Sequence, residues 1–160
     1  MKLFIILILI LIANSSLAQG DSKLQGKWKV TAISQVVSSS GDSLYYSLCQ
    51  DSIYIPPADL REAARDGLDS IQAVNLFKGM YGSLKNSTIT FAGDSVIVEY
   101  GMSRAIGTFH IKGTDEVTMD LFFEENESED ITYIFILKGD ILELILKQDI
   151  GYTRFVYRKE

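Results

Sequence analysis

The chain has 160 residues, of which 47% are hydrophobic and 22% charged, and this composition excludes an intrinsically disordered protein. Its 15 basic and 21 acidic residues give a formal net charge of −6, which disfavours a nucleic-acid partner because the chain would repel phosphate groups. A single cysteine, Cys49, excludes an intramolecular disulfide, so a hydrophobic core has to hold the fold. We expect Cys49 to be a small apolar residue of that core, with a reactive thiol and an intermolecular bridge as its alternatives.

Residues 1–18 have the three-part pattern of a cleaved signal peptide. A lysine supplies positive charge, residues 3–13 form an unbroken apolar run, and Ser16 and Ala18 place small side chains before the cleavage point. The run of 11 residues is shorter than the roughly 20 residues of a membrane-spanning helix, and a buried N-terminal helix is its alternative. We therefore expect one domain over residues 19–160, soluble, periplasmic or secreted, and without a membrane span. No cysteine follows the run, so we do not expect a lipoprotein.

The first strand is expected to begin at Trp28, the only tryptophan of the chain. Trp28, Val30 and Ala32 share one face under the two-residue period of a strand, while the residues between them are lysine and threonine. After a turn or loop, two short segments of high strand propensity follow before a pair of prolines ends extended pairing: 44–48 and 52–55.

Two short helices are predicted next, over residues 58–66 and 70–82. The first is rich in alanine and begins with acidic residues, and Gly67 is its expected C-cap. Asp69 can cap the second, whose apolar residues recur at helical spacing: Ile71, Val74, Phe77 and Tyr81. We expect the apolar faces of both helices to cover the mouth of a barrel.

The remaining chain has the pattern of a β-meander, in which strands of alternating character are separated by short turns, most of them containing glycine. The strands are expected at residues 88–91, 95–100, 105–112, 116–123, 131–138, 141–147 and 152–158, with an acidic loop at 124–130. We therefore predict a mainly β protein, an antiparallel up-and-down barrel of about eight strands with two short helices after the first strands, because closure removes exposed strand edges. A sandwich is the competing architecture.

The alternation also selects candidates for the interior of the barrel. A shift of the strand phase by one residue would reverse every face, so these residues test the phase as well as the fold. The expected inward residues are Val98, Tyr100, Met119, Leu121, Tyr133, Phe135, Leu144 and Phe155.

Gly26-Lys27-Trp28 at the start of the first strand, Gly107-Thr108-Phe109-His110-Ile111 and the last strand at 152–158 resemble the lipocalin family and its calycin relatives. The chain is most similar to the short lipocalin-like domains of exported bacterial proteins. The resemblance implies a ligand-binding barrel whose base is closed by Gly26 and Trp28. It also implies that an arginine of the last strand, Arg158 or Arg154, stacks on the indole, a contact of about 0.5–2 kcal/mol. The two inserted helices resemble the fatty-acid-binding branch more than a typical lipocalin.

Few residues point to chemistry. His110, the single histidine, lacks further His or Cys ligands at metal-site spacing, and no nucleophile motif accompanies it. The acidic residues 124–130 lack the spaced oxygen ligands and central glycine of a calcium loop, so a solvated loop is expected. The sequence predicts no catalytic residue, no metal site and no cofactor.

Three classes of function remain open. The first is binding of a small apolar molecule in the barrel, without catalysis. The second is a filled barrel that binds another protein through the 58–84 region or the acidic loop, which would leave an exposed apolar patch and no cavity. The third is a hydrolase or isomerase, which would need converging polar groups of perturbed acidity in a pocket.

Overall fold

The computed structural model describes residues 23–36, 43–123, 128–149 and 151–160. The predicted signal peptide and residues 124–127 of the predicted acidic loop lie outside these ranges. None of the helices in the described ranges has the length and apolar character needed to cross a membrane. The elements in chain order are β1 (Gly26–Val36), β2 (Ser43–Ser47), β3 (Ser52–Tyr54), α2 (Pro57–Arg65), α3 (Ser70–Gly82), the 3₁₀ helix η1 (Ser83–Asn86), β4 (Thr88–Ala92), β5 (Ser95–Tyr100), β6 (Ser103–Lys112), β7 (Glu116–Phe123), β8 (Ser128–Lys138), β9 (Ile141–Lys147) and β10 (Tyr152–Lys159).

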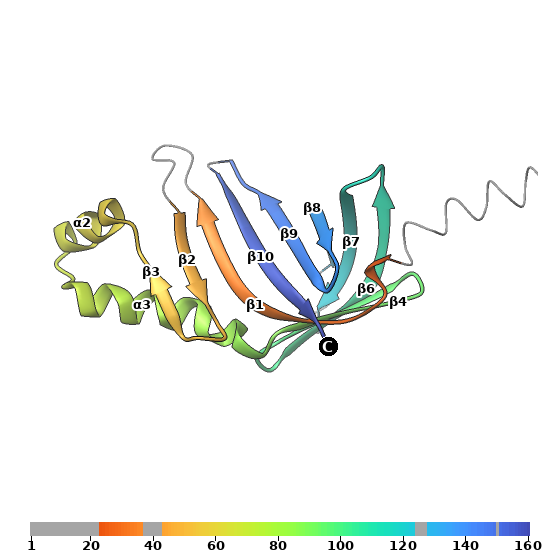
Figure 1. Cartoon of the computed structure of the whole chain (residues 1–160), viewed down its shortest axis with the longest axis horizontal. Coiled ribbons are helices and arrows are strands. Elements are labelled where there is room, and N and C mark those ends of the chain that lie inside the picture. Colours follow the sequence, from red (N-terminus) through yellow and green to blue (C-terminus); the bar gives the residue numbers. More distant parts are fainter. Residues whose placement is uncertain (1–22, 37–42, 124–127, 150) are drawn as a thin grey trace, which may run out of the picture.

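Eight strands close into an antiparallel barrel. From β4 to β10 each strand pairs with its neighbour in sequence, and β1 pairs with β4 on one edge and with β10 on the other. The β1–β10 pairing runs from Trp28↔Lys159 to Val36↔Tyr152 and completes the ring (Figure 1). The predicted fold class is confirmed, and the continuous pairing decides for a barrel over a sandwich.

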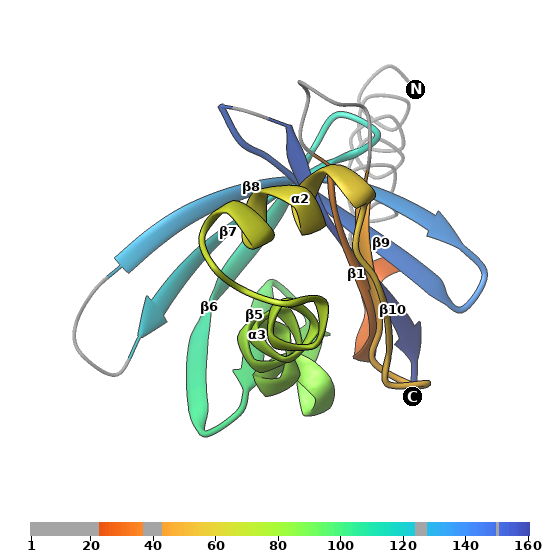
Figure 2. The ribbon, with the colours of Figure 1, turned by 90° about the vertical axis from the view of Figure 1, so that its left-hand side faces the viewer.

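One edge of β1 pairs with two strands, β4 and β2. Its first residues, Gly26 to Lys29, pair with β4, and its later residues, Ala32 to Val36, pair with β2. The hairpin of β2 and β3 therefore extends the sheet away from the barrel as a flap (Figure 1). The two helices follow this flap, as predicted, and in the view from the flap side they lie in front of the barrel strands (Figure 2).

A bulge in β1 changes which of its residues face inward. The register against β10 shifts between Val30, which pairs with Tyr157, and Ala32, which pairs with Val156. The strand phase is reversed beyond the bulge, so Ile33 joins Trp28 and Val30 in the core. The expectation that Ala32 shares the face of Trp28 is therefore wrong. Ala32 lies on the outer face of the barrel, beside Val156 of β10.

The core has two parts. The larger part fills the barrel, and the smaller lies under the flap, formed by Val30, Ile33, Tyr46 and Leu48. Phe155 and Tyr157 of β10 pack against both parts. The predicted strand phase is confirmed, because the residues expected to face inward either belong to the barrel core or line its cavity.

The helices begin where the sequence predicts. Pro57 stands in the first turn of α2, and Asp69 caps α3 through a reciprocal pair of hydrogen bonds with Gln72. α2 ends at Arg65 with Asp66 as its C-cap, one residue before the expected Gly67, which follows at φ +85° in a conformation that suits glycine. A second expectation fails: Ile71, expected on the apolar face of α3, is 70% exposed.

The acidic loop is shorter than predicted. Ser128, Glu129 and Asp130 are the first residues of β8 and pair with β7, Asp130 opposite Asp120. All three side chains are exposed, but they do not share a face. Ser128 and Asp130 face outward, whereas Glu129 pairs with the inward Leu121 and shares the face of Ile131 and Tyr133 at the end of the strand.

Candidate functional site

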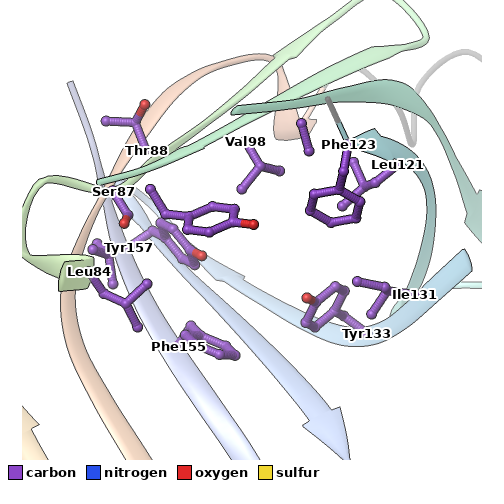
Figure 3. A pocket seen from close by; sticks show the side chains of 13 residues that line it. Leu84, Ser87, Thr88, Val98, Leu121, Phe123, Ile131, Tyr133, Phe155 and Tyr157 are labelled. Atoms are coloured by element: carbon purple, nitrogen blue, oxygen red, sulfur yellow. The ribbon is translucent and has the colours of Figure 1, made fainter. Parts of the chain in front are cut away.

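A cavity of about 250 Å³ lies inside the barrel beside the flap. It opens to solvent and lies at the junction between the two parts of the core, where Phe155 and Tyr157 pack against both. Figure 3 shows side chains from several strands pointing into it, with Leu84 and Ser87 at one end and Leu121 and Ile131 at the other. The lining residues are Val30, Leu84, Ser87, Thr88, Val98, Tyr100, Ala105, Leu121, Phe123, Ile131, Tyr133, Phe155 and Tyr157.

The walls of the cavity are apolar apart from hydroxyl groups. Eight lining residues have aliphatic or phenyl side chains, and the other five are Ser87, Thr88, Tyr100, Tyr133 and Tyr157. None of them carries a charge at neutral pH. Apolar walls with a few polar groups are typical of sites that bind small molecules.

Ser87 contributes a buried hydroxyl whose hydrogen-bonding capacity is unused. Its side chain is 5% exposed, and its Oγ has no hydrogen-bond partner among the described residues. The backbone fixes its position, because its N–H donates to the Leu84 carbonyl at 2.9 Å and its carbonyl accepts from the Val30 N–H at 3.1 Å. A buried hydroxyl without a partner costs stability, so a bound group that paired with it would remove this cost.

Two tyrosines place hydroxyls in the same space. Tyr133 of β8 and Tyr157 of β10 point toward the interior of the cavity (Figure 3). Burial, with a smaller contribution from Glu129, raises the pKa of Tyr133 to about 12. Burial also raises the pKa of Tyr157, and the nearby Tyr133 adds to the shift. Both phenols therefore stay protonated at physiological pH, where each can donate and accept a hydrogen bond.

The segment that forms the mouth is tied to the flap. Leu84 of η1 lines the cavity, and η1 directly continues α3. The Tyr81 hydroxyl of α3 donates to Gln35 Oε1 at 2.7 Å, and Lys78 Nζ lies 2.8 Å from the Asp51 carbonyl and 3.1 Å from its carboxylate. These bonds hold the end of α3 beside β1 and the flap, and so set the position of Leu84.

Trp28 lies at the closed base of the barrel rather than in the cavity. Its side chain is fully buried, and its Nε1–H donates to the Leu24 carbonyl at 2.7 Å. Gly26, at φ +119°, precedes it, and a Cβ there would come within 2.9 Å of Lys159 Cε. The backbone conformation therefore requires glycine, whereas the flexible end of the Lys159 side chain could move aside for a Cβ.

The cation on the indole is Lys159 and not Arg158 or Arg154. Lys159 Nζ lies 5.2 Å from the centroid of the Trp28 ring. Residues alternate between the two faces of β10, so Lys159 shares the face of Tyr157, while Arg158 and Arg154 point outward. The Arg154 Nε instead lies 3.5 Å from the carboxylate of Glu143.

Cys49 and His110 lie on the outside. Cys49, expected in the core, is an exposed free thiol in the turn between β2 and β3 and borders a surface hollow beside Arg154 and Arg158. His110 is exposed on β6, opposite Thr118. In the described ranges no group of three or more His, Cys, Asp and Glu side chains is placed to hold a metal ion.

Sequence reasoning found much of the cavity wall but missed its end. Strand alternation selected Val98, Tyr100, Leu121, Tyr133 and Phe155. Leu84 and Ser87 were not selected, because they lie in η1 and in the link that follows it, where no two-residue period marks an inward side chain.

Comparison with known proteins gives little. No protein-family description and no curated protein matches the chain. Among solved structures it is similar to "As-p18, an extracellular fatty acid binding protein", with 14% sequence identity and a TM-score of 0.39 over 86% of this chain and 96% of that chain. Function therefore has to be inferred from the cavity itself.

Proposed function

We propose that the chain is a binding protein that holds a small, mainly apolar molecule in the barrel cavity. The observation that carries this proposal is the 250 Å³ cavity, which stays unfilled inside a barrel whose other inward side chains are packed together. Protein interiors are normally close-packed, so a void of this size with one open side favours a ligand over a purely structural core.

Binding without catalysis is the simpler use of this cavity. Acid–base or nucleophilic chemistry needs a group that changes its protonation near neutral pH or an activated nucleophile. None of the lining residues is a carboxylate, a histidine, a lysine or a cysteine. The hydroxyls that are present suit the orientation of a ligand.

A protein-interaction module is the second candidate. Three apolar side chains of α3 are more than half exposed: Ile71 at 70%, Met80 at 58% and Leu76 at 52%. Exposed apolar residues on one helix favour a protein partner. The filled barrel that this candidate assumed is not observed, because the cavity is present.

We also propose that the domain acts outside the cytoplasm, on the basis of the signal-peptide pattern of residues 1–18. Removal of these residues would leave 14 basic and 21 acidic residues, a net charge of −7. Intact-mass measurement of protein from the host cells should give a chain that begins at Gln19. A chain that retains its first 18 residues would refute this proposal.

Titration of the protein with small amphiphiles tests binding. Calorimetry or protein NMR with octan-1-ol, octanoate and ethylbenzene should reveal saturable binding of at least one of them. Ala105→Leu should abolish it, because Ala105 is fully buried and lines the cavity, and the added atoms would occupy the space of the ligand. Ala92→Leu, at an exposed position at the end of β4, is the matched control and should bind normally. If none of the three molecules binds, the carrier proposal fails and the protein-interaction candidate takes its place.

A further inference from the structure

The charge of the cavity restricts what it can hold. A carboxylate that enters an apolar cavity loses its hydration, and it needs a cation or several hydrogen bonds to compensate. No lining residue is cationic. The charged group bonded to a lining side chain is negative, since Thr88 Oγ1 donates to the Glu99 carboxylate at 3.0 Å.

The basic residues nearest in sequence to the lining are directed elsewhere. Lys159 lies over Trp28 at the base, and Arg154 and Arg158 border the hollow on the outer surface. Lys85, Lys29 and Arg104, which adjoin Leu84, Val30 and Ala105, are exposed to solvent. Arg104 pairs with Glu99 across the strands. The internal stretches outside the described ranges, 37–42, 124–127 and 150, contain no lysine or arginine. An anionic head group would therefore have no buried cationic partner among the described residues.

The hydroxyls define the polar part of the ligand. Ser87 Oγ is buried and has no partner among the described residues, and the Tyr133 and Tyr157 phenols line the same cavity. A pure hydrocarbon would leave the Ser87 hydroxyl unsatisfied. A single hydroxyl or carbonyl group could pair with it without bringing in a charge.

The volume sets the size. An apolar cavity of about 150 Å³ holds benzene, which has six non-hydrogen atoms, so a cavity of about 250 Å³ holds roughly eight to ten such atoms. A longer tail could leave through the open side.

From these observations we infer that the cavity binds an uncharged molecule of roughly eight to ten non-hydrogen atoms that carries one hydroxyl or carbonyl group, such as a medium-chain alcohol or ketone, and that it excludes the corresponding carboxylates. Ser87 Oγ is the anchor of this polar group, and the phenols of Tyr133 and Tyr157 line the same cavity. This inference rests on the binding function proposed above and identifies the class of ligand.

The first arm of the test compares octan-1-ol with octanoate at pH 7.5. The alcohol should bind the wild-type protein at least about tenfold more tightly, because only the carboxylate has to lose the hydration of a charge. Equal or tighter binding of octanoate would overturn the inference while leaving the carrier function intact. Failure of both, and of ethylbenzene, would instead remove the carrier function.

The second arm removes the anchor. Ser87→Ala should weaken octan-1-ol about three- to tenfold, the effect of one lost hydrogen bond, and change the affinity for ethylbenzene less than about twofold. Ser52→Ala, at an exposed position on β3, is the matched control and should change neither affinity. If Ser87→Ala affects both ligands equally, or affects neither, Ser87 is not the anchor and the inference is wrong.

A stability measurement separates binding from folding in this variant. Ser87→Ala removes a buried hydroxyl that has no hydrogen-bond partner in the part of the chain that the structure describes, so the ligand-free variant should unfold at the same or a higher urea concentration than the wild type. A lower unfolding midpoint would show that the hydroxyl supports the fold, which would contradict its assignment to the ligand.

Discussion

The buried indole of Trp28 connects β1 to the residues just before it and to the last strand, through the Leu24 carbonyl and the Lys159 ammonium. We expect Trp28→Ala to lower the free energy of unfolding by about 3–5 kcal/mol, the range for loss of a large aromatic side chain from a core. Urea unfolding followed by circular dichroism measures this, since the variant lacks the tryptophan needed for fluorescence. Lys159→Gln, which removes only the cation, should cost at most about 1 kcal/mol. Similar losses in both variants would mean that the cation, and not the packing, stabilises the base.

The cavity tyrosines make stability depend on alkaline pH. The pKa of Tyr133 is about 12 in the folded protein, whereas an exposed tyrosine has a pKa near 10. The unfolded chain therefore loses this proton first, and the free energy of unfolding should fall as the pH rises from about 10 to about 12. Tyr133→Phe should make this fall smaller by about 2 kcal/mol in urea unfolding at pH 8, 10 and 11.5. An unchanged pH profile in the variant would contradict burial of the phenol.

The wrong sequence predictions for single residues have local causes. Cys49 was placed in the core because free cysteines are usually buried, but it lies in a turn, where the chain leaves the sheet. Arg158 was assigned to the indole from family resemblance, but the alternation along β10 gives that position to Lys159. In both cases the position of the side chain depends on residues that are neighbours only in the folded structure. A single sequence does not show these neighbours.

At the scale of elements, β6 and β7 leave no room for a side chain at Gly107, which pairs with Leu121. A Cβ on Gly107 would overlap the carbonyl oxygen of Asp120, so the two strands could not keep their spacing. Gly107→Ala should therefore destabilise the protein by about 2–4 kcal/mol, measured by urea unfolding. Gly79→Ala is the control, because nothing lies within 4 Å of its added Cβ. It should stabilise the protein by about 0.5–1 kcal/mol through the higher helix propensity of alanine.

Removal of the Lys78 side chain should loosen α3 from the flap. Lys78 is bonded to the carbonyl and the carboxylate of Asp51, and the same carboxylate accepts a 2.6 Å hydrogen bond from Tyr46. Lys78→Met should speed hydrogen exchange of the α3 amides while leaving the barrel strands protected. Lys112→Met, at an exposed position on β6, should leave α3 unchanged. If the α3 amides exchange at the same rate in the wild type and in both variants, contacts other than those of Lys78 hold α3.

Element by element, the strands and both helices were predictable because turns and alternation repeat along the chain. The bulge near Thr31 was not, because Lys27 to Ala32 alternate as they would in a regular strand. Sequence patterns do not identify Ser87 as a cavity residue, because it lies outside the regular strands. It lies between η1 and β4, held by backbone bonds to Leu84 and Val30 that no periodic pattern announces.

At the scale of the whole molecule, the architecture could be narrowed but not decided from the sequence. The short up-and-down connections favour a barrel over a sandwich, but the choice depends on whether the first and last strands pair. Trp28 and Lys159 are 131 positions apart, and no local pattern in either strand indicates the other. The presence of a cavity likewise depends on how side chains from β4 to β10 fill a shared space.

The pairing of β1 with β10 has a consequence for how the chain is made. Glu160 N–H donates to the Lys27 carbonyl at 2.9 Å, so the seam extends past the end of β10. The seam cannot form until β10 has been synthesised, and until then β1 keeps an open edge. While β4 to β9 are being synthesised, the nascent chain therefore holds an incomplete barrel. Until β10 pairs with β1, its exposed strand edge is open to pairing with other chains.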